Sequence, residues 1–196
     1  MIYLKTFNES KNDIDYICRK YLIKNYTINR DGSIDVDGDF NLFHKSLTKL
    51  PIRFNYVSGY FDCSHNQLKS LEGSPGWFDC SYNQLITLKF GPEIIKEHIN
   101  CRNNLLTTLE YCPERVGRYF NCNYNQLWTL KYYPRELHGG ILCGNNPLPI
   151  LIRDNIKHID IICQEAEDFS IWRRDGTLDE RRFKYMMEIL KEEGKI

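Results

Sequence analysis

Two features that mark common classes of protein are missing from this sequence of 196 residues. No run of about 18 apolar residues occurs, so no segment is predicted to span a membrane. Lys and Arg total 26 and Asp and Glu total 26, so the formal net charge is zero. General polyanion binders usually carry a strong basic excess, so nucleic acid is not expected as a partner. The 42% of hydrophobic residues is enough for a folded core.

The eight cysteines lack the spacing of a metal site. Zinc sites typically pair cysteines about two to four residues apart, and no such pair occurs in this sequence. We therefore predict that the thiols serve as small buried apolar groups, and we expect no metal or other cofactor. The opening residues become polar by Asn8, before any apolar stretch long enough for a secretion signal. A cytoplasmic location with reduced thiols is the expectation.

An internal repeat dominates the middle of the chain. Each copy reads apolar-x-Cys-x-x-Asn-x-Leu, and the cysteines follow one another at steps of 17, 21, 21 and 21 residues. The aligned copies begin at Phe61, Phe78, Ile99, Phe120 and Ile141. A degenerate earlier copy begins at Phe40, which gives six repeats. A fixed period of this length predicts a solenoid of stacked supersecondary units.

The repeat predicts which side chains face the interior. Side chains alternate between the two faces of a strand, so the first apolar residue and the Cys point inward. The Asn that follows three residues later is expected to satisfy turn backbone groups that stacking buries. The buried ladders predicted in this way are Cys63, Cys80, Cys101, Cys122 and Cys143, and Asn66, Asn83, Asn104, Asn125 and Asn146.

This pattern resembles the core of a leucine-rich repeat, and the match covers roughly residues 36 to 151. The connection from Cys112 to Cys122 looks like those of leucine-rich-repeat proteins from tailed bacteriophages and some bacteria. The resemblance implies about six short parallel strands. Because proline and glycine leave no room for a long helix in each repeat, we expect irregular or 3₁₀ returns. A phage origin would place the protein in the host cytoplasm.

Both ends of a solenoid expose apolar surface and need caps. Residues 1–36 are predicted to form the first cap, a helix over 10–23 followed by a hairpin around Asp31-Gly32. The repeats then fill 37–151, and 152–196 form a C-terminal cap. Within that cap we predict a last strand near 159–162. A helix to about Glu193 should begin at the capping box Thr177-Leu178-Asp179-Glu180.

A binding surface is expected on the concave face of the sheet, where outward side chains form stripes. One stripe is aromatic and the other runs from acidic to amide residues. Tyr, Trp and Arg dominate the energetics of many interfaces, which favours a protein partner, for example a host protein. The predicted partner-binding residues are Tyr60, Asp62, His65, Trp77, Asp79, Tyr82, His98, Asn100, Arg102, Tyr119, Asn121 and Tyr124.

Several alternatives stay open at this point. The aromatic residues could pack only against one another across neighbouring strands. A hydrolase could use the carboxylates of Asp62 and Asp79 with His65 or His98, although no catalytic motif or metal-ligand spacing appears, so an enzyme is not expected. A basic cluster at Arg173–Lys184 could contact an acidic partner, but interleaved acidic residues favour a solvated surface. The oligomeric state is not predicted.

The last alternative is a structural or packaged virion component. The segment Leu4–Glu9 looks like the leaders that direct large-phage proteins into the head. If it acts as such an address, mass spectrometry of the mature protein will show a chain that begins near Glu9. An intact start at Met1 would contradict packaging through this leader and favour a binding module.

Overall fold

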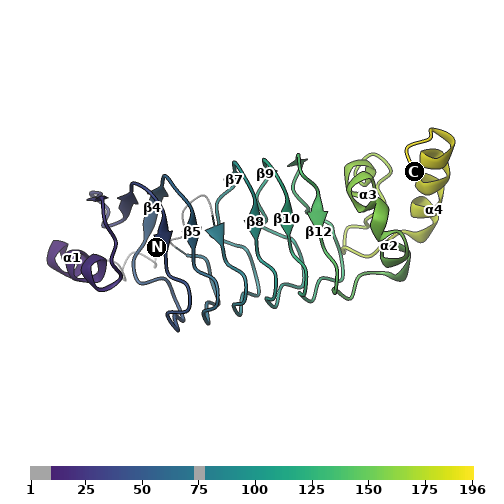
Figure 1. The fold of residues 1–196 in the computed structure, drawn as a ribbon. Helices are drawn as coiled ribbons and strands as arrows, with labels where there is room; N and C mark the ends of the chain where they lie inside the picture. Colours follow the sequence, from purple (N-terminus) through teal and green to yellow (C-terminus); the bar gives the residue numbers. More distant parts are fainter. Residues whose placement is uncertain (1–9, 73–77) are drawn as a thin grey trace.

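The structure is a computed structural model that describes residues 10–72 and 78–196. Its parallel strands stack as a β-solenoid of about five turns, with helices at both ends (Figure 1). The leader at Leu4–Glu9 and the predicted binding residue Trp77 lie outside the described residues.

The first strands of the repeats form one parallel sheet, in the order β12-β10-β8-β6-β5-β3. Equivalent residues are register partners, as Phe120 is with both Ile99 and Ile141. This sheet confirms the prediction of about six stacked parallel strands. The strands are β3 (Phe40–Asn41), β5 (Phe61–Asp62), β6 (Phe78–Asp79), β8 (Ile99–Asn100), β10 (Phe120–Asn121) and β12 (Ile141–Leu142).

The returns differ from the predicted irregular or 3₁₀ connections. Three of them contain short strands that form a second parallel sheet, β7 (Ile94–Ile95), β9 (Arg115–Val116) and β11 (Glu136–Leu137), in the order β11-β9-β7. Among the described residues the 3₁₀ helix lies beyond the repeats, at η1 (Ile156–His158). In-register stacking explains the second sheet, because it brings the backbones of successive returns to hydrogen-bonding distance as well.

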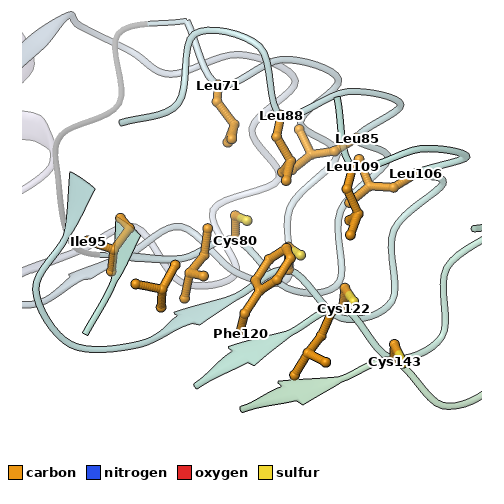
Figure 2. Close-up of a cluster of buried hydrophobic side chains, with 14 of the residues drawn as sticks. Leu71, Cys80, Leu85, Leu88, Ile95, Leu106, Leu109, Phe120, Cys122 and Cys143 are labelled. Atoms are coloured by element: carbon orange, nitrogen blue, oxygen red, sulfur yellow. The ribbon is translucent and has the colours of Figure 1, made fainter. Parts of the chain in front are cut away.

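The interior of the solenoid is filled by the predicted ladders. Figure 2 shows Leu71, Leu88 and Leu109 in a row that faces the strand side, from which Cys80 and Phe120 project. All five ladder thiols and the paired Leu rows from Leu68 to Leu130 are buried. Burial of apolar side chains stabilises the stack by about 25 cal/mol for each Å² removed from water.

The Asn ladder joins each turn to the one before it. In the middle of the stack, Asn104 Oδ1 accepts from the Leu85 N–H of the preceding turn at 3.0 Å. Its Nδ2 donates to the carbonyls of Cys80 in the preceding turn and Cys101 in its own, both at 3.0 Å. Asn66, Asn83, Asn125 and Asn146 make equivalent bonds to both turns. The predicted inward role of these amides is thereby confirmed.

The N-terminal end contains the predicted helix and hairpin. Helix α1 (Lys11–Lys20) begins with a capping box between Ser10 and Asp13, and it buries Ile14 and Cys18. Strands β1 (Tyr26–Ile28) and β2 (Ile34–Val36) then pair antiparallel. Strand β2 also pairs in parallel with β4 (Phe54–Val57), which joins the hairpin to the solenoid.

The C-terminal end is helical, and one prediction for it is wrong. The residues predicted as a last strand form helix α3 (Ile159–Glu165), in which Ile159, Ile162 and Cys163 are buried at helical spacing. It follows α2 (Ile150–Asp154), and α4 (Glu180–Glu192) ends the fold as predicted. The capping residue of α4 is Asp179, which accepts from Arg182 N, and not Thr177 of the predicted capping box. No helix of the described residues has the length and apolar character that crossing a membrane requires.

The ladder predicts a large effect of a single amide. We expect Asn104→Ala to lower the free energy of unfolding by about 1–3 kcal/mol, because buried backbone groups of two turns lose their partner. Urea denaturation measures this change. Gln84→Ala is the matched control, since this exposed side chain makes no hydrogen bond to the described residues and should change stability by less than about 0.5 kcal/mol. Equal effects of the two variants would contradict a structural role for the ladder.

Candidate binding face

The candidate site is the outward surface of the six-stranded sheet, which we call the outer face. It consists of the outward strand residues together with the corner residues that follow each strand. The strand alternation places Phe61 and Cys63 inside and leaves Asp62 between them partly exposed. The outward strand residues are Asn41, Asp62, Asp79, Asn100, Asn121 and Leu142, none of them buried.

One row of aromatic rings precedes the strands. Tyr60 and Tyr119 are 38% and 39% exposed, and His98 is half-buried between their turns. The rings of His98 and Tyr119 stack with centroids 4.8 Å apart, and Tyr60 lies 6.5 Å from His98. The rings therefore pack against one another and still leave more than a third of each tyrosine open to a partner.

A second aromatic row occupies the corners after the strands. His65, Tyr82 and Tyr124 have φ angles of 54°, 52° and 55°, the left-handed region that non-glycine residues rarely adopt. His65 stacks on Tyr82 with centroids 4.2 Å apart, and it makes an edge contact with Phe43 at 5.0 Å. The tight turn imposed by the Asn ladder holds these rings outward, because the interior side of the corner is occupied by the amide.

Arg102 lies between the rings of this second row. Its guanidinium carbon is 5.2 Å from the Tyr82 centroid and 5.6 Å from that of Tyr124, and Nη2 donates to the Tyr82 hydroxyl at 3.0 Å. Among the described residues no carboxylate forms an ion pair with Arg102, and its buried Nε has no hydrogen-bond partner. The guanidinium is thus held by aromatic faces and keeps unused donors.

The side chains of the acidic-to-amide stripe accept hydrogen bonds that stabilise the ends of the strands. Asp62 Oδ1 accepts from the Ser64 N–H and hydroxyl at 2.9 and 2.7 Å. Asp79 Oδ1 accepts from Ser81 N at 2.8 Å, while its Oδ2 accepts from Asn100 Nδ2 at 2.7 Å. Burial and these two carboxylates raise the pKa of the neighbouring Tyr60 phenol well above its usual value. Both oxygens of Asp79 are engaged, which leaves little freedom for general-base chemistry.

Sequence reasoning missed a third row of exposed rings, on the returns. Phe90, Tyr111 and Tyr132 are 57%, 54% and 51% exposed and also have positive φ angles. Lys89 lies over the rings of Phe90 and Tyr111, and Lys131 over that of Tyr132. The signal was present in the sequence, since these rings recur every 21 residues, each two residues before a proline.

Comparison of the chain with protein-family models, with curated proteins and with solved structures found no match. The arrangement of the side chains therefore carries the functional argument.

The basic cluster of the C-terminal cap is mixed with acidic groups. Arg173 lies 3.5 Å from Asp179, and Lys184 lies 3.9 Å from Glu180. Arg182 donates to the Ser170 carbonyl at 3.2 Å. These exposed contacts dilute the positive charge of the cluster, in agreement with the solvated-surface interpretation.

The thiol ladder offers no metal site among the described residues, where no group of three or more His, Cys, Asp or Glu side chains is placed to hold an ion. Burial raises the pKa of Cys63, Cys80 and Cys122 well above the ordinary value near 9.0. Burial likewise raises the pKa of Cys143 to about 12. The folded protein therefore keeps these thiols protonated and unreactive at neutral pH.

These pKa shifts predict a loss of stability in alkali. Above about pH 9 the unfolded chain releases thiol protons that the folded chain retains, so the free energy of unfolding falls as the pH rises. The slope is at most about 1.4 kcal/mol per pH unit for each buried thiol. Urea titrations between about pH 8 and 10.5 with a reducing agent measure it. Cys122→Ala should make the slope shallower, whereas an unchanged slope would contradict burial of a protonated thiol at this position.

Proposed function

We propose that the chain is a leucine-rich-repeat-type module that binds a partner protein through the outer face. The in-register sheet, the Asn ladder and the Leu rows support the assignment to this type of repeat. The proposal takes the chain to be a binding protein and not an enzyme. The protein partner would be a host protein if the chain is phage-encoded.

The observation that carries the proposal is the cluster of Tyr82, Arg102 and Tyr124. Tyr and Arg are enriched at the energetic centres of interfaces, and Tyr buries a large area with few rotatable bonds. Here a guanidinium is already fixed between two rings that remain exposed, so little conformational entropy is lost when a partner covers it. The first aromatic row and the half-exposed amides beside it extend the same surface across the turns.

The hydrolase alternative has weaker support. The carboxylates of Asp62 and Asp79 already accept hydrogen bonds from Ser64, Ser81 and Asn100, and His65 and His98 are stacked against aromatic rings. The cavities at the hairpin and at the C-terminal cap are lined by other residues, such as Thr27 and Tyr133. No specific observation favours the packaged-component alternative, whose leader lies outside the described residues.

The proposal is tested by affinity capture, in which the immobilised chain retains partner proteins from extracts of the cells that produce it. We expect the triple variant Tyr82→Ala, Arg102→Ala, Tyr124→Ala to lose the partner, with an affinity reduced about 30-fold or more, as for the loss of interface hot spots worth about 2 kcal/mol. The matched control is Phe90→Ala, Tyr111→Ala, Tyr132→Ala, which removes equally exposed rings from the returns. Recovery of the same partners by both variants would show that the outer face is not the binding surface.

A further inference from the structure

The two parallel sheets end differently at the last turn of the solenoid. In the six-stranded sheet each strand donates to the next, as Phe120 N does to the Gly140 carbonyl at 3.0 Å. After the last strand a side chain takes over this role, because Ile141 N donates to Asp160 Oδ1 of α3 at 2.7 Å. The C-terminal cap therefore closes this edge at Ile141.

The edge of β11 in the second sheet has no such closure. Glu136 N and His138 N donate back to the carbonyls of Glu114 and Val116, at 3.0 and 3.2 Å. Because successive backbone groups of a strand face opposite sides, the N–H and C=O of Leu137 and the C=O of Arg135 face away from β9. Among the described residues these three groups have no hydrogen-bond partner.

In earlier turns the backbone groups equivalent to these open groups bond to the next strand of the sheet. The carbonyl of Ile95 accepts from Gly117 N at 2.9 Å, and that of Val116 accepts from His138 N at 3.2 Å. Leu137 is the next member of this series, and the residue 21 positions after it, His158, lies in the helical cap. The described part of the chain therefore supplies no further strand to this sheet.

A groove of about 480 Å³ runs beside the open edge. It is lined by Arg135 and Leu137 from the strand side and by Asp160, Cys163 and Gln164 from α3. The unpartnered backbone groups are thus accessible to a chain that enters the groove. An open strand edge of this kind is a template for an added strand.

The side chains at the edge indicate the sequence that would fit. Along the sheet, Arg115 pairs with Glu136 at 3.1 Å. A further in-register strand would place a basic residue beside Glu136 and an acidic residue beside Arg135. An apolar residue would continue the row of Ile95, Val116 and Leu137.

We propose that the β11 edge docks an extended segment of a partner protein, which adds in parallel as a fourth strand of the β7-β9-β11 sheet. The segment carries an acidic, a basic and an apolar residue in succession. Strand β9 already has this pattern, because Glu114-Arg115-Val116 occupies the same positions one turn earlier than β11. This surface is separate from the outer face.

The probe is a synthetic peptide with the sequence of residues 113–119, Pro-Glu-Arg-Val-Gly-Arg-Tyr. It is titrated into the full ¹⁵N-labelled chain while amide resonances are followed by NMR. We expect saturable shifts centred on the amides of Leu137 and His138. Absence of these shifts at millimolar peptide would overturn the proposal.

Two N-methylated peptides test strand pairing itself. Methylation of the Gly nitrogen removes the donor that would bond to the Leu137 carbonyl, so affinity should fall roughly tenfold or more. Methylation of the Val nitrogen is the matched control, because that N–H faces away from β11 in the docked strand, and binding should persist. Equal affinities of the two peptides would overturn strand addition.

A charge exchange tests the side-chain pattern. A peptide with its Glu and first Arg exchanged should bind the natural chain more weakly. The variant Arg115→Glu, Arg135→Glu, Glu136→Arg, which keeps opposite charges at positions 115 and 136, should restore its affinity. Loss without restoration, or no loss, would overturn the acidic-basic assignment. Concentration-dependent self-association that shifts the Leu137 amide without peptide would instead identify a second copy of the chain as the occupant.

Discussion

The stack depends on one interaction, the bidirectional hydrogen bonding of the Asn ladder. Each amide accepts from the preceding turn with its oxygen and donates with its nitrogen to carbonyls of both turns. A buried corner without this side chain would leave several backbone groups unsatisfied, which we expect to lower the free energy of unfolding by about 1–3 kcal/mol. Because the amide bonds to both turns at once, it fixes the register as well as the turn.

The fixed register determines which side chains become neighbours on the surface. Equivalent residues of successive turns become direct neighbours, so rings can stack but like charges would repel. Most pairs on the chain follow this constraint: His98 stacks on Tyr119, while Asp79 meets Asn100 and Arg115 meets Glu136. Asp62 and Asp79 are the exception, because these two carboxylates are register partners. The position of Arg102 is occupied by smaller residues in other turns, such as the buried Ser64 and Ser81. The longer side chain of Arg102 extends over the outer face. The differences between repeats, more than their common pattern, define the candidate site.

The same register leaves a problem at the ends, where a parallel strand always has an unpaired side. The chain solves it twice by different means. Near the N-terminus β1 pairs antiparallel with β2 and so covers one edge of the sheet that contains β4, and at the C-terminus Asp160 substitutes for a carbonyl beside Ile141. The cap reaches one sheet at this point and leaves the edge of Leu137 accessible, which makes the end of the solenoid chemically distinct from its outer face.

The sequence alone determined the stacked parallel strands, the buried thiols and amides, and the N-terminal helix and hairpin, because each follows from a local period. It also placed Tyr82, Arg102 and Tyr124 on one surface, although only the structure showed the guanidinium between the rings, a contact across turns about 20 residues apart. The spacing of the isoleucines near 159–162 is compatible with a strand or with a helix. In the structure this segment forms α3, which buries Ile159 and Ile162. The strands β7, β9 and β11 are two residues each, and their recurring apolar residue, Ile95, Val116 or Leu137, does not distinguish a strand from an irregular return. Their pairing depends on how successive returns stack on one another, so tertiary structure had to reveal it.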